Sequence, residues 1–337
     1  MFYHHKLFFL MILMLGSLIS ISSNSWMGMW MGLEINLLSF IPLIQEKNNS
    51  FSSESSLKYF LSQALASTIL LFSMIFLSKN FLILKNIENL MILIFNSSLL
   101  MKMGMAPFHF WFPEVIEGLN WINSLILLTW QKITPMVLVM YNFNFQYFFF
   151  IIIIFSMLVS SFMGINQISF RKILAYSSIN HMAWMISAMF FSETIWFYYL
   201  LTYFILTINI WIMFKMFNIF YFNQMISYLK NNLLMKLMFS FNFLSLGGLP
   251  PFIGFFPKWL TIQYMINNNW MLMSFLMIML TLMTLFYYMR LIFNILILNS
   301  NNLNYLLTFK SKNFLIWNFN LLILMSLILY NLLFNYI

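Results

Sequence analysis

Long apolar runs separated by short polar segments dominate this chain. Eleven stretches are long enough for a helix to cross a bilayer, which takes about 20 residues with a range of about 17–25. They lie at 7–23, 26–44, 55–78, 87–117, 121–141, 145–163, 172–190, 194–219, 237–267, 270–298 and 314–335. No connecting segment is long or polar enough to form a soluble domain. The pattern predicts an all-α integral membrane protein, with one polytopic domain over residues 1–337.

Two of these stretches are interrupted by helix-breaking residues. The stretch 87–117 contains Pro107, and 237–267 contains the sequence Gly-Gly-Leu-Pro-Pro at 247–251. Proline lacks the backbone donor that a helix needs and clashes with the preceding turn, so we expect both helices to be discontinuous. Broken helices at matching places in two halves are typical of inverted-repeat transporters. The expected parts are repeat one over about 7–141, repeat two over about 145–298, and an extra helix over about 314–335.

The composition excludes several classes of protein. Hydrophobic residues make up 63% of the 337 residues and charged residues only 7%, whereas soluble domains have about 25% charged residues. There is no cysteine, which excludes disulfides, Fe–S ligation and thiol chemistry. The four histidines show no pattern of metal or haem ligands. The net charge of +9 is spread over short loops rather than clustered, so we expect no nucleic-acid binding.

The loop charges predict the orientation. An odd number of spans puts the two termini on opposite sides of the membrane, and the basic loop residues then sort almost entirely to the N-terminal side. That side carries Lys6, Lys47, Lys58, Arg171, Lys172, Lys215, Lys230, Lys236, Lys310 and Lys312, against Lys79 and Lys85 on the other. The positive-inside rule therefore places the N-terminus in the matrix or cytoplasm. Abundant Met, Phe and Asn with few Ala and Gly suggests an AT-rich coding genome such as a mitochondrial one.

Four ionisable residues lie inside the apolar spans: Glu34, Lys102, Lys132 and Lys258. A charge at the centre of a membrane helix costs roughly 2.5–3.5 kcal/mol on insertion scales, so such residues usually mark an ion or proton pathway. Burial disfavours the charged form of lysine and a nearby carboxylate favours it, so changing their separation can load or unload a proton.

His109 and His181 are the candidates to relay protons between these groups. For all six residues a purely structural role is the alternative interpretation. Glu34 can be a hydrogen-bonded packing residue, the lysines can extend their amines towards an interface, and the histidines can be hydrogen-bonded parts of the core.

Five segments resemble subunit 2 of mitochondrial NADH:ubiquinone oxidoreductase, respiratory complex I. They are GLEINLLSFIP at 32–42, MGMAPFHFWFPE at 103–114, TWQK at 129–132, NQISFRKILAYSS at 166–178 and LGGLPPFIGFFPKW at 246–259. The resemblance covers nearly the whole chain, and eleven spans match the shortened animal form of this family, which lacks three N-terminal helices. Met103, where leucine is common, is a mild departure.

The resemblance implies an antiporter-like subunit of the membrane arm. Its proton pathway falls here on Glu34 paired with Lys102, then Lys132, then Lys258. The chain would contain no cofactor, because NADH, FMN, Fe–S clusters and ubiquinone are bound by other subunits. Its partners would be those subunits and lipid, cardiolipin included, with no small-molecule substrate other than protons. The implied location is the mitochondrial inner membrane, with the N-terminus in the matrix and the C-terminus in the intermembrane space.

Two other functions fit part of the pattern. One is a subunit of a multi-subunit bacterial cation/proton antiporter, which shares many of these motifs. The other is a structural membrane subunit whose buried charges only fix helix packing. The span count and the composition favour the complex I interpretation over the first alternative.

Overall fold

The computed structural model describes residues 2–46, 49–78, 85–143, 145–229 and 233–297, together with Asn320. In these ranges the chain is helical, with a single antiparallel bridge between Ser169 and Tyr221. Seven of the described helical stretches are long and apolar enough to span a membrane. The all-α, multi-pass class predicted from the sequence is confirmed for this part of the chain. The expected helix 314–335, apart from Asn320, lies outside the described residues, as do Lys47, Lys79, Lys230, Lys310 and Lys312.

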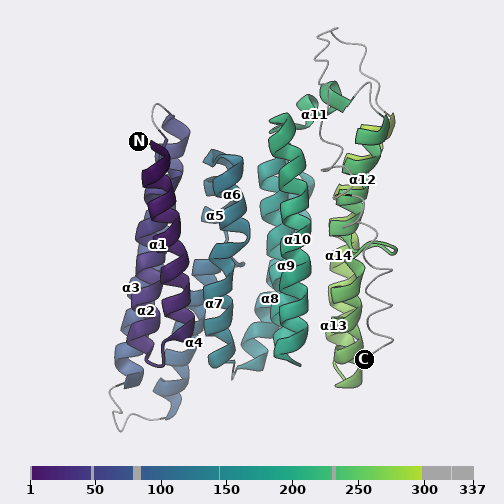
Figure 1. Cartoon of the computed structure of the whole chain (residues 1–337). Helices are drawn as coiled ribbons and strands as arrows, with labels where there is room; N and C mark the ends of the chain where they lie inside the picture. Colours follow the sequence, from purple (N-terminus) through teal and green to yellow (C-terminus); the bar gives the residue numbers. More distant parts are fainter. Residues whose placement is uncertain are drawn as a thin grey trace, which may run out of the picture. The chain divides into compact units, whose positions relative to one another are not determined.

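The chain divides into two compact units, Met1–Ser156 and Met157–Ile337, and the division falls inside helix α8, which is labelled with the other helices in Figure 1. The helices of the first unit are α1 Phe2–Ser22, α2 Trp26–Ile44, α3 Ser50–Ser78, α4 Lys85–Met103, α5 Trp111–Gly118, α6 Trp121–Leu128, α7 Trp130–Tyr141 and the first part of α8 Gln146–Ile165. Those of the second are the rest of α8, α9 Phe170–Met189, α10 Glu193–Phe217, α11 Phe222–Leu229, α12 Leu233–Gly247, α13 Phe255–Asn267 and α14 Met271–Ile297.

In the first unit, α1 and α2 cross with their backbones in close contact. A Cβ atom added at Gly32 would lie 2.6 Å from the backbone nitrogen of Ser20, and one at Gly16 would lie 3.0 Å from that of Asn36. Small residues at a crossing let membrane helices approach this closely. Helix α2 also contacts α3, which packs on α4 and α5, while α7 contacts α1, α4 and α6. The result places α2, α4 and α7, the helices that carry Glu34, Lys102 and Lys132, in one bundle.

In the second unit, α9 is the most deeply buried helix. Its residues from Ile173 to Ala188 are all buried, although they include serines, Asn180 and His181. This helix lacks the hydropathy of the seven apolar spans. Its polar groups are tolerated because protein, rather than lipid, encloses them. It contacts α10 and α13, while α12 and α13 pack on α10 and α14.

Both interrupted stretches end their first helix with the same backbone motif. After α4, Gly104 N–H donates to Met101 O and Met105 N–H donates to Leu100 O. After α12, Gly248 N–H donates to Ser245 O and Leu249 N–H to Leu244 O. This is the Schellman motif, in which the residue just past the helix takes a positive φ, here 74° at Gly104 and 79° at Gly248. The following helices begin only at Trp111 and Phe255.

Some details differ from the sequence prediction. The stretch 121–141 consists of α6 and α7, divided at Thr129, whose hydroxyl donates to Leu125 O at 2.7 Å. The short helix α11 was not predicted. Lys236, which we assigned to a loop, lies in α12 and is buried.

Candidate functional site

Glu34 lies on α2 and is half-buried. Its Oε1 atom is fully enclosed and has no hydrogen-bond partner among the described residues. The carboxylate is close enough to Lys102 on α4 and to Tyr59 on α3 to act on both electrostatically. Two residues further along α2, Asn36 accepts a 2.7 Å hydrogen bond from Gln131 on α7. Glu34 therefore lies where α2, α3 and α4 meet, close to a hydrogen bond that joins α2 to α7.

Lys102 is buried in the last turn of α4, directly before the break at Gly104. The carbonyl end of a helix carries a partial negative charge, which stabilises a cation there. Gln63 on α3 donates to the Lys102 backbone carbonyl at 3.3 Å, and Trp111 donates to the Met101 carbonyl at 3.1 Å. Gln63 thus satisfies a carbonyl at the end of the helix, while Trp111 is a second donor to the Met101 carbonyl, beside Gly104 N–H. Among the described residues no ion pair joins Lys102 to Glu34, so the two interact at longer range.

Lys132 lies on α7 and is 2% exposed. Its Nζ atom lies 5.1 Å from the centre of the Phe112 ring, at the start of α5. An ammonium over an aromatic face is stabilised by the negative charge of the ring surface. Phe112, just beyond the break in 87–117, therefore contacts the lysine that the family resemblance places next in the expected pathway.

His109 lies in the segment between α4 and α5 and is buried. Its Nδ1 atom is 3.3 Å from the Pro107 carbonyl, and its ring packs on Phe110. In the described structure its hydrogen bond goes to the backbone rather than to a lysine. The relay role of His109 stays a prediction.

In the second unit, Lys258 is buried at the start of α13 and donates to the Gly247 carbonyl, at the end of α12, over 2.8 Å. His181 on α9 shares a 3.0 Å hydrogen bond with the Tyr199 hydroxyl of α10. The neighbouring Asn180 donates to Thr284 on α14 at 3.2 Å. The histidine thus belongs to a buried polar set that joins three helices. Because Lys132 and Lys258 belong to different units, the continuity of the pathway between them stays a prediction.

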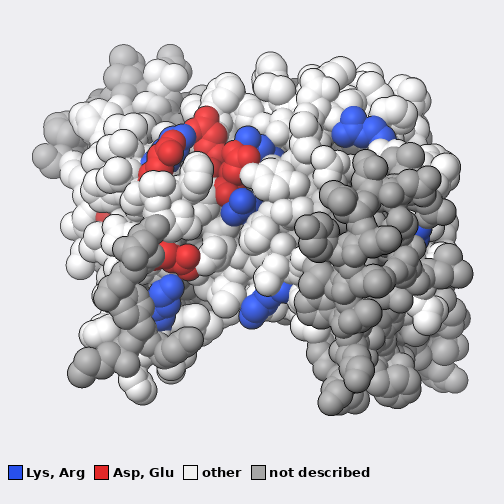
Figure 2. Space-filling model, turned by 90° about the horizontal axis from the view of Figure 1, so that it is seen from above, with Lys and Arg blue, Asp and Glu red and all other residues white. Residues whose placement is uncertain are grey.

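Charged side chains also gather at one end of the first unit (Figure 2). Lys58 pairs with Glu54 at 2.9 Å and with Glu114 at 2.8 Å, and all three side chains are exposed. Exposed pairs of this kind contribute little to stability. They mark the polar end of the bundle, away from the buried set.

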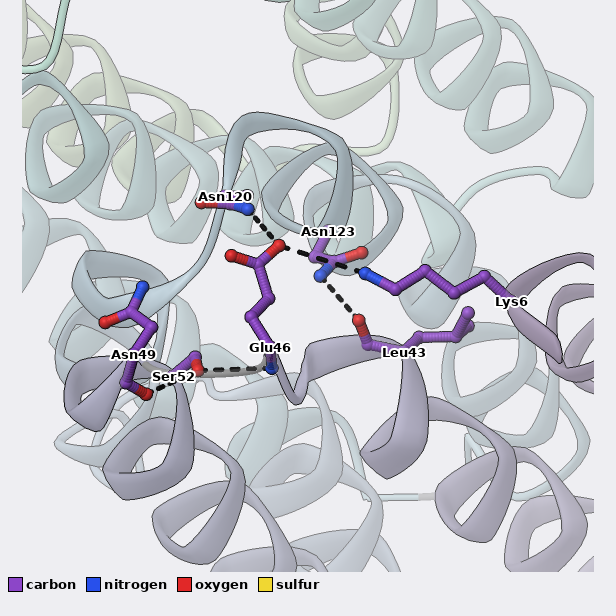
Figure 3. Close-up of polar contacts among 7 residues, drawn as sticks. All are labelled: Lys6, Leu43, Glu46, Asn49, Ser52, Asn120 and Asn123. Atoms are coloured by element: carbon purple, nitrogen blue, oxygen red, sulfur yellow. Dashed lines mark hydrogen bonds and ion pairs between the residues drawn. The ribbon is translucent and has the colours of Figure 1, made fainter. Parts of the chain in front are cut away.

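At the end of α2, Glu46 is held by a small hydrogen-bonded network (Figure 3). Its carboxylate accepts from Asn120 and lies 3.8 Å from Lys6 on α1, while its backbone N–H donates to Ser52 of α3 at 3.3 Å. Asn123 of α6 donates to the Leu43 carbonyl at 2.8 Å. The network ties α1, α3 and α6 to the end of α2, the helix that carries Glu34.

Comparison with known proteins identifies the family. A profile described as "NADH:quinone oxidoreductase/Mrp antiporter, TM" matches residues 23–284. The chain is 51% identical over 309 residues to NADH-ubiquinone oxidoreductase chain 2 of Anopheles gambiae, covering 90% of each chain. It is 49% identical over 335 residues to the same protein of Aedes aegypti, covering 98% of each. The chain belongs to the NADH-ubiquinone oxidoreductase chain 2 family. The resemblance inferred from the five sequence segments is confirmed.

Solved structures show the same fold at low sequence identity. A chain of respiratory complex I from Thermus thermophilus with bound aureothin superposes with a TM-score of 0.84 at 22% identity, covering 97% of this chain and 79% of that one. A chain of the Mrp complex from Dietzia sp. DQ12-45-1b gives 0.74 at 15% identity, covering 85% and 59%. The Mrp likeness is one of fold alone. The relatives at 45–51% identity therefore decide for the complex I interpretation over the antiporter alternative.

Family membership confirms the expected function, a proton-translocating membrane subunit of complex I, an NADH:ubiquinone reductase. The other subunits of that complex are its partners. Among the described residues, no group of three His, Asp or Glu side chains could hold a metal ion.

Sequence reasoning missed several polar neighbours of the site. Gln63 and Tyr199 bond to the site residues Lys102 and His181, and Gln131, next to Lys132, bonds to Asn36. Gln131 precedes Lys132 in the segment 129–132, so a polar pair inside an apolar span was a signal for it. Tyr199 gave no such signal, because tyrosine is common throughout this chain.

Proposed function

We propose that protons move through this subunit by way of Glu34, Lys102, Lys132 and Lys258, with His109 and His181 as relays. The arrangement of Glu34 and Lys102 carries the proposal: the two groups are electrostatically coupled across α2 and α4, yet no ion pair joins them among the described residues. A pair at intermediate range can tighten or loosen with small helix movements. Each change alters how strongly Lys102 holds its proton.

The proposed topology has eleven spans. In it, α4 with α5 and α12 with α13 each form one discontinuous span, and residues 314–335 form the last. Repeat one covers about 7–141 and repeat two about 145–298, in inverted orientation, within a single polytopic domain. The identical Schellman motifs at Gly104 and Gly248, each followed by a non-helical segment, support this assignment.

The proposed location is the mitochondrial inner membrane, with the N-terminus in the matrix and the C-terminus in the intermembrane space. The redox chemistry of NADH, FMN, Fe–S clusters and ubiquinone is assigned to other subunits. Lipid, cardiolipin included, is assigned to the exposed apolar side of α1. The exposed apolar side chains of α1, such as Leu7, Met11 and Leu15, support a lipid or subunit contact there.

The decisive experiment is Lys132→Ala in complex I. We expect the complex to assemble, and its inhibitor-sensitive NADH:quinone turnover and the protons pumped per NADH to fall. As a matched control, Lys58→Ala removes an exposed, paired lysine of the same unit, and should leave pumping per NADH unchanged. Poor assembly of Lys132→Ala with normal pumping by the assembled fraction would favour the structural alternative.

A further inference from the structure

In the described part of the chain, four helices end in the same Schellman motif, but the residue with positive φ differs. At the ends of α10 and α13 it is asparagine, Asn218 at 50° and Asn269 at 64°. At the ends of α4 and α12 it is glycine, Gly104 at 74° and Gly248 at 79°. Asparagine takes a positive φ more readily than other residues with a side chain. The backbone motif alone therefore does not require glycine at Gly104 or Gly248.

The surroundings of Gly248 do require it. A Cβ atom there would lie 2.8 Å from Cδ, 2.9 Å from Nζ and 3.0 Å from Cε of Lys258. The lysine side chain thus lies directly over the glycine, and its ammonium donates to the carbonyl of the preceding residue, Gly247, at 2.8 Å. Any side chain at this position would compete with Lys258 for the same space.

We propose that Gly248 is a positioning residue for proton transfer: its missing side chain creates the space in which Lys258 docks on the Gly247 carbonyl. The inference rests on the proposed role of Lys258. The accepting carbonyl is at the end of α12, where the helix dipole stabilises a positive charge. The docked position therefore favours the protonated lysine, and leaving that position favours loss of the proton.

The first unit has a related arrangement, in which the glycine lies against an aromatic residue that in turn contacts the lysine. A Cβ atom at Gly104 would lie 2.9 Å from Cβ and 3.0 Å from Cγ of Phe112, whose ring lies below the Lys132 ammonium. In both units, then, the glycine that ends the first helix of an interrupted stretch touches either a pathway lysine or its aromatic contact. Of the four Schellman motifs, the two that end the first helix of an interrupted stretch have glycine, and the other two have asparagine.

The test uses Gly248→Asn in complex I, because Asn218 and Asn269 show that asparagine fits this motif in this chain. A cryo-EM structure of the variant should show the Lys258 ammonium displaced from the Gly247 carbonyl. The matched control is Gly247→Ala, whose Cβ would make ordinary contact with Leu285 at 3.7 Å. In that control the ammonium should stay on the carbonyl. Lys258 remaining docked in Gly248→Asn would overturn the inference.

The functional arm compares Gly248→Asn with Lys258→Ala. Misplacing a positioned group by about 1 Å can cost on the order of a hundredfold in rate, so coupled turnover of Gly248→Asn should fall at least about tenfold. The double variant should pump no worse than Lys258→Ala, because both changes act on one side chain. Displacement of Lys258 with normal pumping would overturn the positioning role. Normal pumping by Lys258→Ala itself would instead remove Lys258 from the proposed pathway.

If Gly248→Asn does not assemble, the double variant decides. Removing the Lys258 side chain beyond Cβ removes the three nearest contacts that the new Cβ would make, at 2.8, 2.9 and 3.0 Å. Gly248→Asn with Lys258→Ala should then assemble as well as Lys258→Ala alone. Failure of the double variant to assemble would show that the glycine serves the backbone rather than the lysine.

Discussion

Neutralising Glu34 and Lys102 separately and together tests whether the two form a functional pair. The changes are Glu34→Gln, which keeps the shape of the side chain, and Lys102→Met, which keeps most of its length. Either single change leaves the other group as an uncompensated charge in an apolar bundle. Breaking a buried pair in this way costs roughly 3–5 kcal/mol. The double variant has no charge left to compensate, so its assembly should be better than that of either single variant.

Coulomb's law gives the order of magnitude of the expected coupling. Among the described residues no direct ion pair joins these groups, yet the Glu34 charge acts on Lys102. For unit charges about 5–8 Å apart at an effective dielectric constant of about 20, the interaction is about 2–3 kcal/mol. Moving one charge across a potential of 100 mV takes about 2.3 kcal/mol. A change in this one pairing is therefore of the size that proton transfer against the membrane potential requires.

The assay measures two quantities on the same membranes. Native gels with thermal inactivation give the amount and stability of assembled complex I, and vesicle acidification gives protons pumped per NADH. We expect assembly to recover in the double variant while pumping stays low in all three, because the proton-carrying groups are missing. If the losses of stability in the two single variants simply add in the double, the pair does not interact. If pumping per assembled complex is normal in all three, both residues serve packing alone.

Three further outcomes follow from the structure. Gly32→Val should separate α1 from α2, at a cost of about 1–3 kcal/mol for overpacking, and lower the melting temperature of the complex; Met31→Ala, at a site 49% exposed on the same helix, should not. Phe112→Leu should lose the contact with the Lys132 ammonium, worth about 0.5–2 kcal/mol, and lower coupled turnover, whereas Phe95→Leu, equally buried on α4, should affect stability only. A C-terminal tag should be reached by protease from the intermembrane space in intact mitoplasts, and reaction from the matrix side alone would refute the eleven-span topology.

Helix positions were predictable wherever apolar length alone decides them. The expected spans 26–44, 145–163 and 270–298 correspond to α2, α8 and α14 within a few residues at either end. The helix α9 was also found, although it is polar, because its serines and His181 are set among enough apolar residues to keep a span of the right length. Hydropathy reports transfer from water to lipid, and by that measure α9 is not among the seven apolar spans, so its length decided the prediction.

Short-range geometry was beyond the sequence pattern. The split at Thr129 depends on a side-chain hydroxyl bonding to a carbonyl one turn back, which a sliding window does not register. The burial of Lys236 depends on which helices surround α12, and a basic residue near a span end looks the same in a loop. Gly104 and Gly248 could be predicted to break helices, but not to lie against Phe112 and Lys258, because those contacts arise only when the next helix folds back.

The structural alternative, in which buried charges only fix helix packing, is weakest at Glu34. Helices α2 and α7 are already joined two residues away by Gln131 and Asn36 at 2.7 Å, and the end of α2 is joined to α6 by Asn123 at 2.8 Å. Both of these are neutral hydrogen bonds that cost little to bury. A carboxylate kept for packing would have both oxygens bonded, since an unsatisfied buried oxygen costs more than the bond it lacks. The Oε1 atom of Glu34 has no such bond in the described structure. Glu34 therefore adds an electrostatic cost to a helix contact that neutral hydrogen bonds already hold. A group that exchanges protons has to bear this cost, whereas a residue kept only for packing does not.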